Sequence, residues 1–175
     1  IIETFYTFKH QIAMSSLKAL PTDSPKKEKI VFFSDEGDIL RLIKHEDTTN
    51  LVKYFNQHGY DKKLMVRFVG YAINMVKPYS FKSLCLMDMT LLPNDVMKRI
   101  FQVVLCEYQD EVGPDRMSYL VLASRQIAEF LVEYQQLHES DVADAVEMYD
   151  EYDMDYMEPL VRFLKDSISD GPAEL

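Results

Sequence analysis

The chain has 175 residues, of which 47% are hydrophobic and 27% are charged, a balance typical of a soluble globular domain with one core. Its 29 acidic residues outnumber the 19 basic ones, and the resulting net charge of −10 disfavours nucleic acid and anionic membranes as partners, because both would be repelled. Two cysteines exclude a disulfide scaffold, and no apolar run reaches the roughly 18 residues that a membrane span needs.

We therefore expect an intracellular protein, cytoplasmic or nuclear, with a single domain over residues 1–175. The chain begins at Ile1 and shows no signal-peptide pattern, so we expect a fragment of a longer protein. With 5 glycines and 7 prolines, a turn-rich β-sandwich is disfavoured, and helices are the expected elements.

Residues 2–20 form the first predicted helix. Their apolar side chains share one broad helical face: Phe5, Phe8, Ile12, Leu17 and Leu20. Residues 21–29 contain two prolines, three lysines and no apolar side chain, which predicts a loop or flexible linker.

Short helices with recognisable start and stop signals follow. An N-cap within 34–36 precedes one helix, and Asp47 or Thr48 precedes a second that ends at Gly59. Asp61 is expected to cap a third, which continues to Met75 and ends before Pro78. A strand over residues 66–73 is the alternative within that third segment.

Four further helices are predicted in the second half. One has Pro93 in its first turn and ends before Gly113, and the others cover 115–134, 140–149 and 159–168, before a frayed tail at 170–175. The helix over 115–134 carries the longest 3.6-residue apolar period in the chain. The predicted fold class is all-α, a compact array or bundle of about seven to nine helices without a recognised repeat.

The sequence shows no catalytic signature. The four histidines lie far apart, no nucleotide-binding or nucleophile-elbow motif is present, and Cys85 and Cys106 have no activating neighbour. We predict no enzymatic activity, no cofactor and no metal site. The enzyme alternative would need a site composed of scattered acids and His138.

Two stretches in the second half resemble an F-box. Leu91–Phe101 contains the Leu-Pro start and Ile-Phe end of that family's first helix, and Asp115–Arg125 contains its Leu-x-Leu-x-Ser-Arg pattern. The matching residues are Leu92, Pro93, Val96, Ile100, Phe101, Leu120, Leu122, Ser124 and Arg125. The resemblance implies a Skp-type adaptor docked on the side formed by Pro93, Val96, Ile100 and Phe101.

The segment just before it, Ser80–Met89, resembles an elongin-binding box. Phe81, Cys85 and Met89 lie at the i, i+4 and i+8 positions that such a box presents to its partner's groove. The same spacings are typical of a buried helix, so core packing remains the alternative for both resemblances.

An acidic segment is the strongest compositional anomaly. Residues 126–161 contain no Lys or Arg, and nine acidic residues lie within 139–158. It is interpreted as a solvated loop or as a docking surface whose carboxylates attract a basic partner. The contact residues would then be Tyr149, Tyr152, Met154 and Tyr156. The remaining alternative is a metal site or an intramolecular contact with Lys26, Lys27 and Lys29.

These observations favour a non-enzymatic protein–protein interaction domain, as an adaptor or substrate-receptor component of a cullin-type ubiquitin ligase with a Skp-type or elongin adaptor. The alternative is an assembly or scaffold domain unrelated to ubiquitin, which forms a homodimer or binds a partner helix or basic segment. Lys62, Lys63 and Arg67, and separately Lys98 and Arg99, are interpreted as solvated faces.

Overall fold

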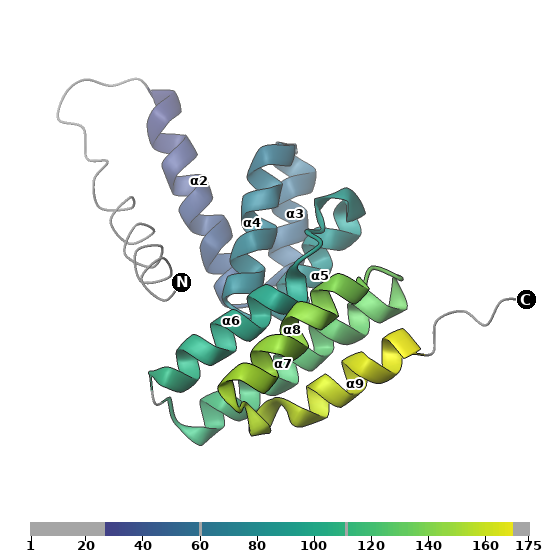
Figure 1. Cartoon of the computed structure of the whole chain (residues 1–175). Helices are drawn as coiled ribbons and strands as arrows, with labels where there is room; N and C mark the ends of the chain where they lie inside the picture. The colour runs from purple at the N-terminus through teal and green to yellow at the C-terminus, as the bar shows by residue number, and fades with distance from the viewer. Residues whose placement is uncertain (1–26, 60, 111, 170–175) are drawn as a thin grey trace, which may run out of the picture. The chain divides into compact units, whose positions relative to one another are not determined.

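The computed structural model describes residues 27–59, 61–110 and 112–169, and within these ranges it contains helices and no strand. The chain divides into two units, Ile1–Asp35 and Glu36–Leu175, and the packing described below is that of the second. The helices are α2 (Lys27–Lys44), α3 (Thr48–His58), α4 (Lys62–Asn74), α5 (Pro78–Met87), α6 (Val96–Gln109), α7 (Pro114–Glu133), α8 (Glu139–Tyr152) and α9 (Glu158–Ser169) (Figure 1). Two single 3₁₀ turns, η1 (Met89–Leu91) and η2 (Asp155–Met157), complete them, and the predicted all-α class is confirmed.

From α3 onward the helices alternate between two layers. The helices α3, α5, α7 and α9 contact one another in sequence and form one layer, while α4, α6 and α8 form the other. Figure 1 shows α6 and α8 side by side in this second layer. Such alternation is typical of stacked helix pairs, and here it arises without a sequence repeat.

Helix α6 lies at the centre of the core, because it contacts α4, α7 and α8. Half of its side chains are buried, which is more than a helix buries when it packs with one face only. They are Val96, Met97, Ile100, Phe101, Val103, Val104 and Leu105. Burial of each large apolar side chain stabilises the fold by about 1.5–3 kcal/mol. The central position of α6 therefore depends on its apolar sequence.

The N-terminus of α6 is held by a carboxylate from another helix. Asp141 of α8 is 4% exposed, and its two oxygens accept hydrogen bonds from the backbone N–H groups of Met97 (2.7 Å) and Lys98 (2.8 Å). Asp95, at the N-cap position, makes no such side-chain bond. Burial raises the pKa of Asp141, and the two backbone hydrogen bonds oppose that rise. The α6–α8 junction thus satisfies donors that would otherwise be buried without a partner.

The short helices start and stop largely where the sequence predicts. Asp47 caps α3 by accepting from the Asn50 N–H, and Asp61 caps α4 by accepting from Lys63 and Leu64. Gly59 ends α3 with a φ of 78°, a conformation that glycine adopts without strain. The segment 66–73 is helical, so the strand alternative is wrong.

Two predicted starts are wrong. Helix α2 begins at Lys27 and passes through 34–36, because no Gly or Pro interrupts the helix formers before them, and the predicted loop over 21–29 therefore overlaps α2 in its last residues. Pro93 precedes the N-cap of α6 instead of lying in its first turn, since Asp141 fixes the first turn at Met97 and Lys98. The helix predicted at 2–20 and the tail at 170–175 lie outside the described residues.

We predict that Asp141→Asn lowers the free energy of unfolding by about 2 kcal/mol, because an amide can accept from only one of the two backbone donors and turns its NH₂ toward the other. Urea unfolding followed by circular dichroism measures the loss. Asp144→Asn is the matched control on the same helix. It breaks a half-exposed ion pair with Lys98 and should cost about 0.5 kcal/mol. Equal effects of the two substitutions would contradict the role given to Asp141.

Candidate functional site

An open groove of about 570 Å³ lies between α7 and the segment formed by η2 and α9. The first half of α7 provides one wall, and the beginning of α9 with η2 provides the other. Its apolar lining consists of Pro114, Met117, Val121, Leu122, Tyr156, Pro159 and Leu160. These helices are neighbours in one layer, so the groove follows from their packing.

Among the side chains that the structure describes, those of residues 36–59, 61–110 and 112–169, Leu122 is the most exposed large apolar one. It is 60% exposed. On α7 it lies away from the core-facing positions, which are taken by Leu120, Ser124, Ile127 and Leu131. An exposed leucine beside an apolar groove is a surface on which a second protein can bury apolar area.

Tyr156 forms part of the groove wall. Its ring stacks on that of Tyr108 with centroids 4.9 Å apart, and its hydroxyl is the one buried side-chain polar atom without a hydrogen-bond partner among the described residues. Burial, with a smaller contribution from Tyr108, raises the pKa of Tyr156 to about 12. The phenol is therefore neutral at physiological pH and contributes apolar area to the groove.

Carboxylates gather next to this wall, at the end of α8. The pKa of the Tyr149 hydroxyl is raised first by desolvation and then by the charges of four carboxylates, those of Glu158, Asp155, Asp150 and Asp153. Among the described residues, Glu158 alone of these four forms an ion pair, with Arg162 at 2.7 Å. The negative carbonyl end of α8 adds to the same potential.

Both arginines of α7 are neutralised by acids of the chain itself. Arg125, which lines it, pairs with Glu129 at 2.9 Å and lies over the ring of Phe163 at 3.5 Å from the centroid. Arg116 pairs with Glu107 at 3.7 Å. The groove therefore combines an apolar lining with an excess of negative charge.

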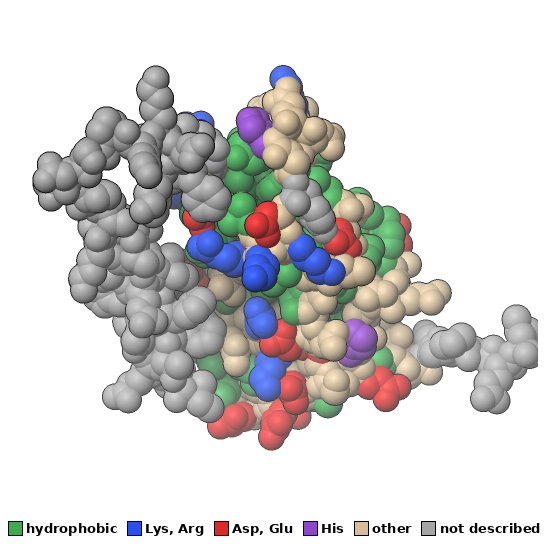
Figure 2. Space-filling view, turned by 90° about the horizontal axis from the view of Figure 1, so that it is seen from above, with side chains coloured by type: hydrophobic (Ala, Val, Ile, Leu, Met, Phe, Trp, Pro, Cys, Tyr) green, Lys and Arg blue, Asp and Glu red, His purple; other side chains and the backbone are tan. Residues whose placement is uncertain are grey.

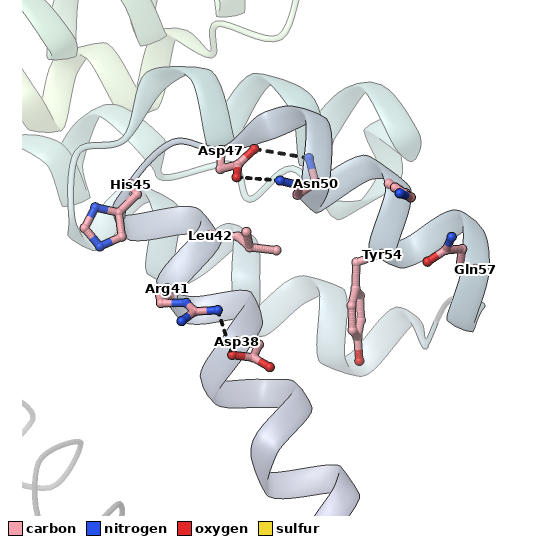
Figure 3. Close-up of a pocket in the computed structure, with 9 residues that line it drawn as sticks. Asp38, Arg41, Leu42, His45, Asp47, Asn50, Tyr54 and Gln57 are labelled. Carbon is pink, nitrogen blue, oxygen red and sulfur yellow. Dashed lines mark hydrogen bonds and ion pairs between the residues drawn. The ribbon is translucent and has the colours of Figure 1, made fainter.

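A second hollow, of about 580 Å³, lies between the C-terminal half of α2 and α3 and has a polar lining. Figure 3 shows Asp38 and Arg41 on α2, Asn50, Tyr54 and Gln57 on α3, and His45 and Asp47 in the connection between the two helices. Asp38 pairs with Arg41 at 3.2 Å. Asp47, which also lines the hollow, accepts two hydrogen bonds from Asn50, and these lower its pKa. Asp38 and Arg41 neutralise each other, and Asp47 and Lys53 add one charge of each sign, so no single ligand charge is favoured.

The residues assigned to an adaptor lie mostly in the core. Phe81, Cys85, Val96, Ile100 and Phe101 are each at most 1% exposed. Met89 and Pro93 are half-buried. Burial raises the pKa of Cys85 to about 12. In this fold, a partner cannot contact the five buried side chains, and their helical spacing reflects core packing.

The predicted contact residues of the acidic segment are divided between core and surface. Met154 is fully buried, Tyr149 and Tyr156 are half-buried, and Tyr152 is 38% exposed. The structure brings Tyr156 together with Leu122, which the sequence associated only with the F-box resemblance. Leu122 lies off the apolar stripe of α7, and this position in the sequence pattern could have indicated that its side chain is at the surface.

The two basic sets lie on neighbouring helices, α4 and α6. Figure 2 shows Lys and Arg side chains in a row on one face, with acidic side chains beside them. Arg67 pairs with Glu36 at 2.6 Å, and Lys98 pairs with Asp144 at 2.8 Å. These ion pairs leave little excess positive charge on this face.

Comparison with protein-family models, with curated proteins and with solved structures finds no match. Within the described residues, no group of three or more His, Cys, Asp or Glu side chains is placed to hold a metal ion. No helix in those ranges is both long and apolar enough to cross a bilayer.

We predict that Ile100→Asp lowers the free energy of unfolding by at least about 4 kcal/mol, because it places an unpaired charge in the core. Thermal unfolding measures the change. Leu86→Asp is the control, since Leu86 is 56% exposed and its substitution should leave stability nearly unchanged. A folded and equally stable Ile100→Asp protein would instead place Ile100 on a surface, as the F-box resemblance implies.

We predict that Tyr156→Phe raises the free energy of unfolding by about 1 kcal/mol, because it removes a buried hydroxyl that has no partner. The control is Tyr119→Phe, which removes a hydroxyl that accepts from Lys77 at 3.1 Å and should lower stability. Urea midpoints with unchanged slopes provide the comparison. Destabilisation by Tyr156→Phe would mean that the hydroxyl has a hydrogen-bond partner.

Proposed function

We propose that this chain is a non-enzymatic protein-interaction domain, and that the groove between α7 and α9 is its docking site for a helical segment of a partner. The observation that carries the proposal is the 60% exposure of Leu122 beside a groove lined by apolar side chains. An exposed apolar side chain beside a concave apolar surface lets a partner bury apolar area at both, and such concave apolar surfaces are typical of binding sites.

A helix suits this groove better than an extended segment. Both walls are helical, so their backbone hydrogen bonds are internal and only side chains face a ligand. An extended segment would gain no backbone pairing here, whereas a helix brings its own hydrogen bonds and presents apolar side chains at i, i+4 and i+7. This agrees with the scaffold interpretation, in which the domain binds a partner helix.

The ubiquitin-ligase link is not needed for this proposal. It rested on an adaptor-facing side that includes Ile100 and Phe101, and both side chains are buried. Membership of a ligase remains a separate prediction, which the Ile100→Asp experiment addresses.

We predict that Leu122→Asp weakens binding of a neutral amphipathic helix at least about tenfold, which corresponds to about 1.4 kcal/mol. The probe is a synthetic peptide of Leu and Gln with a single Trp in its apolar stripe. Because the chain contains no Trp, fluorescence of the indole reports the peptide alone.

The matched control is Leu86→Asp, which introduces the same charge at a similarly exposed leucine on α5. It should leave peptide affinity unchanged, and both variants should unfold at the wild-type urea midpoint. Failure of the peptide to bind, or equal loss in the two variants, would reject the groove as a docking site.

A further inference from the structure

We propose that the occupant of the α7–α9 groove is a basic amphipathic helix, with Lys or Arg beside its apolar stripe. This inference rests on the proposed function, since it names the partner's chemistry at the same site. The groove determines that the ligand has an apolar face, and the charges around the groove determine the sign of the ligand's flanks.

The negative charge next to the groove comes from adjoining elements. Asp150 and Asp153 lie at the end of α8, and Asp155 begins η2, directly before the groove residue Tyr156. All three are exposed, and none forms an ion pair with another described residue. Their charges are therefore available to a ligand.

Positive charge near the groove is used within the chain. Arg125 is occupied by Glu129 and the Phe163 ring, Arg116 by Glu107, and Arg162 by Glu158. An acidic ligand would have to compete for these arginines and would meet three unpaired carboxylates. A basic ligand would meet those carboxylates directly, so charge complementarity selects it over an acidic or neutral one.

Two tyrosine side chains, those of Tyr156 and Tyr152, are consistent with such a ligand. The ring of Tyr156 lines the groove and its hydroxyl is buried, so the ring offers contact area at low entropic cost. Tyr152 is 38% exposed next to Glu151, whose charge contributes most to the raised pKa of that tyrosine. An aromatic face beside a carboxylate attracts a Lys or Arg side chain through both groups.

The test compares three peptides of about 18 residues, or five helical turns. They share one apolar stripe with a single Trp and differ only in flanks of Lys, Gln or Glu. We expect the Lys peptide to bind at least about tenfold more tightly than the Glu peptide at low salt, with the Gln peptide between them. The ratio should fall as salt is raised, because exposed charges are screened.

Leu122→Asp separates docking from general attraction to an acidic chain. The substitution adds a carboxylate, so a peptide held by charge alone would bind the variant at least as well as the wild type. A peptide seated in the groove would instead lose about tenfold in affinity. Retained binding of the Lys peptide would overturn the inference.

Removing the carboxylates of Asp153 and Asp155 tests directly whether they contribute to the affinity for a basic peptide. Asp153→Asn with Asp155→Asn should weaken the Lys peptide at least about threefold and leave the Gln peptide unchanged. Asn also tolerates the left-handed conformation of Asp153, whose φ is 51°, so the fold is preserved. Asp38→Asn, at the polar hollow on α2, is the control and should change neither affinity.

The outcomes distinguish this inference from the proposed function. Equal binding of all three peptides, lost in Leu122→Asp, would keep the docking site and reject a basic partner. No binding of any peptide would reject both. A dimer in light scattering that Leu122→Asp dissociates would make a second copy of the chain the occupant, which also overturns the inference.

Discussion

The hydrogen bonds from the Met97 and Lys98 amides to the buried Asp141 carboxylate connect the start of the central helix to a helix more than forty residues later. Helix α6 contacts α4, α7 and α8, so the position of its first turn affects both layers. The carboxylate loses hydration in this site, as its raised pKa shows, and the two amides compensate that loss. Most of the remaining core packing is apolar and non-directional, whereas this junction, with the half-exposed Lys98–Asp144 ion pair beside it, fixes one register of α8 on α6.

That register also determines where the groove lies. Asp141 fixes the first turn of α8 against α6. The last turn of α8 is followed by Asp153, which is in the left-handed conformation, and then by η2, which contains Tyr156. Helix α9 then packs against α7 and leaves Leu122 uncovered. The apolar wall and the adjoining carboxylates therefore belong to one continuous segment, and their combination is a consequence of how α8 is anchored.

The local signals of the sequence predicted much of the fold. Asp47, Gly59 and Asp61 act through neighbours within four residues, so their capping roles could be predicted without tertiary information. The start of α6 could not, because its acceptor, Asp141, is distant in the sequence. The candidate site could not be predicted either, because it too depends on contacts between residues that are distant in the sequence. Ile100 and Leu122 are both aliphatic residues on helices, and only the packing of neighbouring helices buries the first and exposes the second.

The groove separates affinity from selectivity in physical terms. Its apolar lining can supply most of the binding free energy for any helix with an apolar stripe, since burial of apolar area does not depend on the charge of the flanks. Exposed carboxylates such as Asp150 and Asp155 contribute little each, but they act together on the association rate and against acidic competitors. Because Arg125 and Arg116 are held by acids of the chain itself, they do not offset this potential. The selectivity of the domain then depends on which cations the chain has already paired, as much as on the acids that it exposes.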